Sequence, residues 1–470
     1  MTTVKSAALF IGTLIGVWCL FPQPGAAQSE QPLRKAVTCS PAPCVLPPKQ
    51  ASEGGALVTN PATAADPIDP QNLLVGSVDW NCLSMGFHIS LDGGSNWTSS
   101  CLKSVNGKRY FYVPGSDPMV GFDRNGNAYA GGDYIDREGF GYGFAGIEHS
   151  SDGVNWSEPV VALGTPLSFP AWGWLTVDTN IASPFANAVY VSAVLIGPPT
   201  YNLWDQLAVS HSNDGGSTWT MVNVLPRQYP PAYDRLTTMA VGKDGAVYLT
   251  WMYCDSGPYV CTNEKGHMLL AKSTDGGDTW SQPVEIATVT MAGLPNSGEY
   301  GHEVSVYFYA PLGVDNSNGP HAGWLYVALN SWTGSQLRVY VAHSSDGGST
   351  WSKPVPVAPA SETHDQFYPW ISASPTGIVG VSWLDRRNDP ANTDYQAFAA
   401  FSSDGGENFG ENVQLTTAFS NPSNNGYPDD LWMGDYTGNA WDGPDYFVAS
   451  WMDSSNGVDM QEVVGGIRLK

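Results

Sequence analysis

Short runs of mainly apolar residues, separated by turns rich in Gly, Asp and Asn, follow one another along most of the chain. One unit shows the order well: apolar runs lie at 236–241, 246–252, 268–272 and 281–286, and the first turn reads Gly242-Lys243-Asp244-Gly245. Helix-type periodicity is hard to find after residue 28, whereas Gly (52), Pro (35) and 12% aromatic residues are abundant. This pattern predicts an all-β chain of short strands joined by tight turns.

A short motif divides the chain into units. It consists of a Ser, an Asp-Gly pair and a closing aromatic, and its successive Asp residues lie 60, 62, 61, 71 and 58 positions apart. Asp-Gly favours a turn because Gly accepts positive φ and the Asp side chain can bind nearby backbone N–H groups. A fixed period built from strands and turns indicates repeated architecture. The six Asp residues of the motif are Asp92, Asp152, Asp214, Asp275, Asp346 and Asp404.

These motifs resemble the Asp boxes, or BNR repeats, of the sialidase-type β-propeller superfamily, and the resemblance extends from about residue 53 to the end. It implies a β-propeller of four-stranded antiparallel blades. Asp boxes also occur in non-catalytic propellers, so the resemblance implies the fold more strongly than any one activity.

The number of blades follows from the last unit. Six units carry the motif, and a seventh begins near Leu431, with strands expected at 446–451 and 462–469, before the chain stops. That unit lacks an outer strand, which the segment 35–46 could supply by pairing with 462–469. We therefore predict seven blades closed by the N-terminal segment; six is the alternative if the last unit docks differently. The expected domains are a signal peptide (1–27), a Pro-rich segment partly completing the last blade (28–52) and the propeller (53–470).

The N-terminus and the cysteines predict a secreted or periplasmic protein. Lys5, an apolar stretch at 7–20 and Gly25-Ala26-Ala27 have the order of a secretory signal, and the apolar stretch is too short for a membrane span. Six cysteines remain after its removal, an even number that favours disulfides. Local pairing, 39–44, 82–101 and 254–261, is the simplest of fifteen connectivities. These residues are Cys39, Cys44, Cys82, Cys101, Cys254 and Cys261.

The net charge of −24 argues against a nucleic-acid partner or an anionic membrane surface. It gives no prediction of the oligomeric state.

The strand order predicts which face of the ring carries the functional site. In an antiparallel meander the motifs, as turns between the third and fourth strands, lie opposite the long loops, so we expect them to be structural. Acidic residues recur on the loop face. They could form a ring of carboxylates that acts in acid–base catalysis or binds a cation. Alternatively, each could bind the backbone of the neighbouring blade, and we favour this structural role for most of them. They precede the first strand or end the second: Glu53, Asp117, Asp234, Glu303, Asp365, Asp430, Asp79, Asp133, Asp385 and Asp453.

Residues that break the repeat are better candidates for function. The candidate catalytic residues are Asp234, Tyr300, Glu303, Asp365 and Asp385. The candidate substrate-binding residues are Arg235, Arg386, Arg387, His302, His364 and Trp370. Four aromatic residues could offer platforms for sugar rings or pack between blades: Trp172, Trp174, Tyr201 and Trp204.

A sialidase site uses three arginines, which grip the substrate carboxylate, together with a Tyr nucleophile. The sialidase Arg-Ile-Pro motif is missing from this chain, and no arginine lies between Arg34 and Arg109. We therefore expect a glycosidase (or lyase) that acts on an extracellular glycan or glycoconjugate without true exo-sialidase activity. The alternatives are a non-catalytic lectin-like or protein-binding propeller, and a propeller whose acids hold a structural cation at the channel mouth. No other cofactor is expected.

Overall fold

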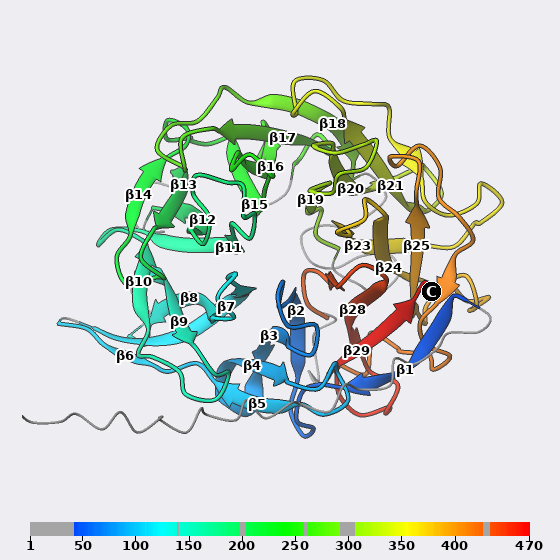
Figure 1. Cartoon of the computed structure of the whole chain (residues 1–470), viewed down its shortest axis with the longest axis horizontal. Coiled ribbons are helices and arrows are strands. Elements are labelled where there is room, and N and C mark those ends of the chain that lie inside the picture. Colours follow the sequence, from blue (N-terminus) through cyan, green and yellow to red (C-terminus); the bar gives the residue numbers. More distant parts are fainter. Residues whose placement is uncertain are drawn as a thin grey trace, which may run out of the picture. The chain divides into compact units, whose positions relative to one another are not determined.

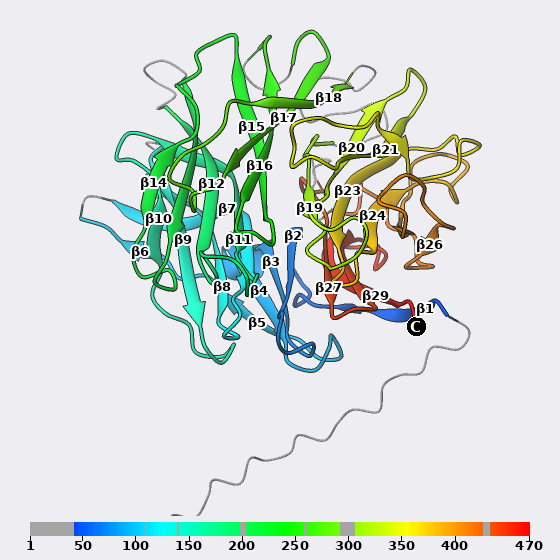
Figure 2. The ribbon, with the colours of Figure 1, turned by 45° about the horizontal axis from the view of Figure 1, so that its top comes forward.

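Seven antiparallel sheets follow one another around a central axis in the computed structural model (Figure 1). The structure describes residues 42–108, 110–138, 141–197, 204–257, 261–291, 306–425 and 433–470. The view turned by 45° shows the sheets standing side by side as blades around the axis (Figure 2). The predicted seven-bladed, all-β propeller is confirmed.

Each blade carries four main strands, which follow one another from the axis outward. Blade 1 contains β2 (Val58–Ala65), β3 (Leu73–Asp79), β4 (Ser84–Ser90) and β5 (Thr98–Cys101), with a 3-10 turn at Trp80–Cys82. Blade 2 contains β7 (Phe111–Phe122), β8 (Ala128–Asp136), β9 (Gly143–Ser150) and β10 (Val160–Leu163), and β6 (Val105–Asn106) adds to β7. Blade 3 contains β11 (Phe169–Val177), β12 (Val189–Ile196), β13 (Asp205–Ser212) and β14 (Thr220–Asn223).

The remaining blades repeat this order. Blade 4 contains β15 (Tyr233–Val241), β16 (Val247–Cys254), β17 (Lys265–Ser273) and β18 (Val284–Thr290). Blade 5 contains β19 (Leu312–Val314), β20 (Leu325–Trp332), β21 (Leu337–Ser344) and β22 (Val355–Pro356). Blade 6 contains β23 (Gln366–Ala373), β24 (Val379–Asp385), β25 (Gln396–Ser402) and β26 (Val413–Gln414). Blade 7 contains β27 (Gly438–Asp442), β28 (Tyr446–Asp453), β29 (Gln461–Arg468) and β1 (Cys44–Gln50).

The two ends of the described chain meet in blade 7. Strand β1 pairs antiparallel with β29, from Cys44 opposite Arg468 to Gln50 opposite Val463, and the blue and red strands lie side by side in Figure 1. The predicted closure by the N-terminal segment is confirmed, although the pairing strand lies a few residues further along than 35–46. The expected signal peptide, 1–27, lies outside the described residues.

Two faces of the ring can be defined from the strand pairing. In blade 4, Val241 pairs with Val247, which pairs with Ser273; these residues mark the edge where the Ser-x-Asp-Gly motifs lie, which we call the turn face. Tyr233 pairs with Cys254 at the opposite edge, which we call the loop face.

The polar side chains of each Ser-x-Asp-Gly turn form hydrogen bonds within that turn. In blade 5, Ser344 Oγ donates to Asp346 Oδ1 (2.8 Å) and accepts from the N–H of Gly348 (2.9 Å). Asp346 also accepts from the hydroxyl (2.6 Å) and the N–H (2.9 Å) of Thr350, and these bonds lower its pKa to about 2. The same Ser-to-Asp bond occurs in the other five turns. The expected structural role of these aspartates follows from their use inside the turn.

The disulfides Cys82–Cys101 and Cys254–Cys261 are present as predicted. Cys39 lies outside the described residues, so its pairing with Cys44 stays a prediction. Across the described ranges, no helix is long and apolar enough to cross a membrane.

We expect Ser344→Ala to lower the free energy of unfolding by about 1–3 kcal/mol, because it leaves the buried N–H of Gly348 without its acceptor. Thermal and urea unfolding would measure this. Ser349→Ala in the same turn is the matched control, since the Ser349 hydroxyl bonds only to an exposed carbonyl, that of Asp346 (3.2 Å). Equal stability losses in the two variants would contradict the role assigned to the buried bond.

Candidate active site at the loop face

Five inner strands carry a bulge near the loop face. At each bulge the pairing register shifts, and one residue other than glycine takes a positive φ of 51–59°. Left-handed backbone is strained for such residues, and bulges re-aim side chains. Each of these residues lies five positions before the end of its strand: Asn60, Asp117, Trp172, Leu236 and Tyr368.

Contacts between neighbouring blades hold the bulges in place. The Tyr368 hydroxyl donates to the carbonyl of Gly434 (2.7 Å), and the N–H of Asp435 donates to Asn60 Oδ1 (3.0 Å). The N–H of Trp172 donates to Asp117 Oδ2 (2.9 Å). Side chains at the inner end of each blade are therefore fixed by the next blade.

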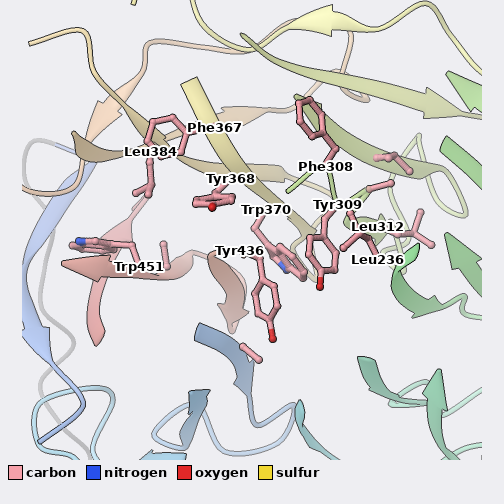
Figure 3. Packing of buried hydrophobic residues seen from close by; sticks show 14 of the residues in the cluster. Leu236, Phe308, Tyr309, Leu312, Phe367, Tyr368, Trp370, Leu384, Tyr436 and Trp451 are labelled. Atoms are coloured by element: carbon pink, nitrogen blue, oxygen red, sulfur yellow. The ribbon is translucent and has the colours of Figure 1, made fainter. Parts of the chain in front are cut away.

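Aromatic residues from four blades meet on the axis. The rings of Trp174 and Trp370 lie 4.7 Å apart between centroids, although they come from blades 3 and 6. Tyr436 lies 5.6 Å from Trp370 and 5.2 Å from Tyr309, and its hydroxyl contacts the carbonyl of Pro118 in blade 2 (3.3 Å). Figure 3 shows Tyr309, Trp370 and Tyr436 side by side. We call Trp174, Tyr309, Trp370 and Tyr436 the axial cluster; it separates the loop-face end of the channel from the turn-face end.

Two buried carboxyl groups lie next to each other beside the axial cluster. Asp117 and Asp133 are in hydrogen-bond contact, and only a protonated carboxyl can supply the proton for that bond. Burial raises the pKa of Asp117; burial, and next the charge of Asp117, raise the pKa of Asp133 well above its ordinary value. Asp117 is 4% exposed and Asp133 is fully buried, so Asp117 is the member nearer to solvent. Burial, together with the charge of Asp117 on Asp133, favours the protonated form of the pair.

This pair breaks the repeat. In blade 2, Asp133 lies five residues after Ala128, the first residue of β8 that pairs with β7. The equivalent position of the second strand is apolar in blades 1, 3, 4 and 6, where it is occupied by Val78, Val194, Met252 and Leu384. A buried acid at a position that is apolar in these other blades is not needed for the fold.

Trp172 lies between this pair and a second group of charges. It is half-buried, its φ is 54°, and its carbonyl accepts from the Thr237 hydroxyl (2.7 Å). The guanidinium of Arg235 lies 5.1 Å from the centre of its ring. Backbone bonds on both sides thus fix an aromatic ring at the loop face.

Beyond Arg235 lie two more buried acids, Asp205 and Asp234. Trp251 Nε1 donates to Asp234 Oδ1 (2.8 Å). Burial raises the pKa of each carboxyl to about 7, and in Asp205 the charge of Asp234 acts in the same direction. The structure thus places the predicted residues Asp234 and Arg235 beside Trp172.

The predicted residues of blade 6 lie elsewhere, in a buried network. Asp365 accepts from the N–H of Leu337 in blade 5 (2.9 Å), and Arg386 Nη1 lies 3.6 Å from Asp365 Oδ2. Asp385 accepts from Trp383 Nε1 (2.7 Å) and from Arg387 Nη2 (2.5 Å). The bond from Leu337 joins blades 5 and 6, and the others lie within blade 6. A catalytic or substrate-binding role for the four predicted residues stays a prediction.

The remaining predicted residues are dispersed. His364 Nδ1 contacts Glu362 Oε1 (2.9 Å), and Trp370 belongs to the axial cluster. Tyr300, His302 and Glu303 lie outside the described residues. Within the described ranges, no group of three His, Cys, Asp or Glu residues could hold a metal ion. A cation at the channel mouth stays a prediction.

The arginines bear on the sialidase alternative. Arg338 Nη2 donates to the carbonyls of Ala358 (2.8 Å) and Pro359 (2.8 Å), and Arg386 Nη1 to that of Asn392 (2.9 Å). These two arginines and Arg387 bond within blades 5 and 6, whereas Arg235 lies at blade 4. Among the described residues, no three arginines converge on one pocket.

The sequence interpretation treated Asp117 as a counterpart of Asp234 and Asp365, and this was wrong. Asp117 occupies the bulge position itself, where blade 4 has Leu236 and blade 6 has Tyr368. Asp205 was missed altogether, since it begins a third strand and carries no motif. The repeat-breaking Pro170-Ala171-Trp172 was the available signal for this part of the site.

Comparisons with known proteins support the fold. No protein-family model matches the chain. A xyloglucanase from Paenibacillus sp is 27% identical over 311 residues, a match that covers 62% of this chain and 26% of the xyloglucanase. This chain thus spans only about a quarter of that relative.

Among solved structures, a protein of unknown function from Dyadobacter fermentans has a TM-score of 0.50 at 14% identity, over 92% of this chain and all of that one. The GH93 α-L-arabinofuranosidase of Fusarium graminearum has a TM-score of 0.48 at 12% identity, over 75% and 92% of the two chains. The intramolecular trans-sialidase of Ruminococcus gnavus has a TM-score of 0.45 at 12% identity, over 72% and 91%. The β-propeller implied by the sequence resemblance, here with seven blades, is thus the observed fold.

The raised pKa values predict how stability depends on pH. Asp205 and Asp234 keep their protons to about pH 7 when folded but release them near pH 4 when unfolded, so the folded chain binds more protons in between. Their contribution to stability is complete below about pH 4 and is lost as pH rises through 7. His88, whose pKa burial lowers to about 4, acts in the opposite direction only below about pH 6.5.

We therefore expect the free energy of unfolding to fall between pH 6 and pH 8, by about 1.3 kcal/mol for each of the two carboxyls. Urea unfolding at several pH values would measure this. Asp234→Asn should flatten the curve in this window. A stability that rises from pH 6 to pH 8 would contradict the assignment.

Proposed function

We propose that this propeller is a glycoside hydrolase with its active site at the loop-face end of the channel. The carrying observation is the buried pair Asp117 and Asp133, both with raised pKa values, next to the fixed ring of Trp172. Hydrolysis of a glycosidic bond needs a carboxylic acid that is still protonated near neutral pH. Like-charge pairing and burial are the two means by which proteins keep a carboxyl protonated.

The neighbouring groups fit this chemistry. Asp117, the more exposed partner, would pass the proton of the pair to the leaving oxygen. Burial raises the pKa of Asp117, whereas the hydrogen bond with Asp133 lowers it; in Asp133, burial and the charge of Asp117 both raise the pKa. The half-buried Asp435 accepts a hydrogen bond from the Asn60 amide (3.3 Å). Burial raises the pKa of Tyr309, and the charges of Asp117 and Asp435 raise it further, which places the two acids near the same ring. As a carboxylate, Asp435 would take the proton of the water that attacks the anomeric carbon. Trp172 would support a sugar ring.

The substrate in this proposal is an extracellular glycan or glycoconjugate. The similarity to a xyloglucanase supports a neutral polysaccharide, although it covers only part of that enzyme. Arg338, Arg386 and Arg387 are bonded to protein oxygens of blades 5 and 6, so they give no support to sialic acid as the substrate. The two disulfides support a secreted or periplasmic location, as proposed from the N-terminal sequence.

The first experiment measures hydrolysis of xyloglucan, arabinan, a uronic-acid glycan and sialosides by the purified protein. We expect Asp117→Asn to lower kcat on the accepted substrate by about 100-fold or more, the usual contribution of a general acid. Asp178→Asn is the matched control, since Asp178 is also fully buried but binds its own turn on the turn face. Wild-type activity of Asp117→Asn would overturn the assignment, and glycan binding without turnover would favour the lectin-like alternative.

A second variant separates acid from positioning residue. Asp133→Asn removes the carboxyl whose pKa is raised by both burial and the charge of Asp117, and still leaves Asp117 a hydrogen-bond donor, so the pair should lose its proton at lower pH. We expect the alkaline limb of the pH–rate profile to move to lower pH while activity at acid pH is largely kept. An unshifted profile would show that Asp133 does not tune the acid.

A further inference from the structure

The axial cluster makes the other end of the channel a blind pocket. Trp174 and Trp370 line its inner part, a cavity of about 280 Å³ walled by the inner strands. This part continues into a mouth of about 760 Å³ on the turn face, lined by residues from all seven blades. The two parts share wall residues from several blades, including Thr176, Asn316 and Ser372. A pocket of this size suits a small organic ligand.

Two cations line this mouth. Arg124 follows β7 in blade 2, and Lys243 follows β15 in blade 4; both are half-buried. Arg124 Nη1 donates to the carbonyl of Thr179 (3.2 Å). Lys243 Nζ donates to the carbonyl of Ser317 (3.3 Å) and contacts Asn318 Oδ1. These acceptors are neutral, so neither positive charge is balanced by them.

The chain as a whole is acidic, with 44 acidic and 20 basic residues. Within the described ranges, neither cation lies within 4.0 Å of a carboxylate oxygen. Asp66 also lines the mouth, and its carboxylate accepts from the N–H of Ile68 (2.9 Å). The carboxylate of Asp178 accepts from the N–H of Asn180 (2.9 Å). Two half-buried positive charges therefore face one cavity, where a low dielectric strengthens attraction for an anion.

The opposite part of the mouth is less polar. The half-buried indole of Trp441 and the ring of Pro375 line it from blades 7 and 6. One side of the mouth thus suits an acidic group and the other the body of a ligand.

We propose that the turn-face pocket is a second binding site, for a small organic anion. Arg124 and Lys243 bind its carboxylate, phosphate or sulfate, since a guanidinium fork matches such oxyanions and an ammonium adds charge. Trp441 packs against its body. The site is independent of glycan hydrolysis, because the axial cluster lies between it and Asp117.

Calorimetric titration at low ionic strength with galacturonate, inorganic phosphate and sulfate tests the proposal. We expect saturable binding of at least one anion, with galacturonate favoured if Trp441 contributes. The double substitution Arg124→Gln and Lys243→Gln should weaken binding at least tenfold. The charge-preserving pair Arg124→Lys and Lys243→Arg should retain it, which excludes misfolding as the cause of a loss.

The matched control removes two exposed cations elsewhere, Arg227→Gln and Lys353→Gln, and changes the net charge equally. Its affinity should stay within about twofold of wild type at equal ionic strength. Equal weakening in the control would show a general charge effect and overturn the site. Absence of binding by all three anions up to about 10 mM would also overturn it.

Discussion

The pairing of β1 with β29 is the contact on which the rest of the ring depends. Without it, the outer edge of blade 7 would present an unpaired strand at the point where the first and last parts of the chain meet. The closure also sets blade 1 against blade 7, where Ser77 Oγ donates to the buried Glu462 of β29 and contacts His88 Nε2 (2.9 Å). A closed ring fixes the distance of every inner strand from the axis, so side chains from opposite blades can meet there.

The bulges turn this rigid frame into two different ends of one channel. They aim side chains towards the axis at the loop face, and the tyrosines and tryptophans of four blades fill the space there. On the loop-face side of the axial cluster, burial raises the pKa values of Asp117 and Asp133. On the turn-face side, the inner strands leave a cavity with two cations. The same packing therefore supports acid chemistry at one end and anion binding at the other.

Much of this fold could be predicted from local sequence signals. Asp-Gly turns and apolar runs depend on neighbours in the chain, so the unit at 236–286 was predicted correctly in type and order, and its strands differ mainly at their ends. The number of blades followed from the repeat, and two disulfides from short separations. The closing strand was predicted within 35–46 but spans Cys44–Gln50, because pairing across the ends of a chain has no local marker.

The candidate site could be predicted only in part, because it depends on the bulges. A bulge inserts a residue without a sequence signature, so aligning the acids by their distance from an apolar run equated Asp117 with Asp234 and Asp365. The pairing register shows that the positions of Asp117 and Asp133 are not acidic in blades 4 and 6. Asp365, in contrast, accepts a hydrogen bond from a backbone N–H of the neighbouring blade. Breaking of the repeat was thus the right criterion. It had to be applied to positions in the sheet and not to positions in the sequence.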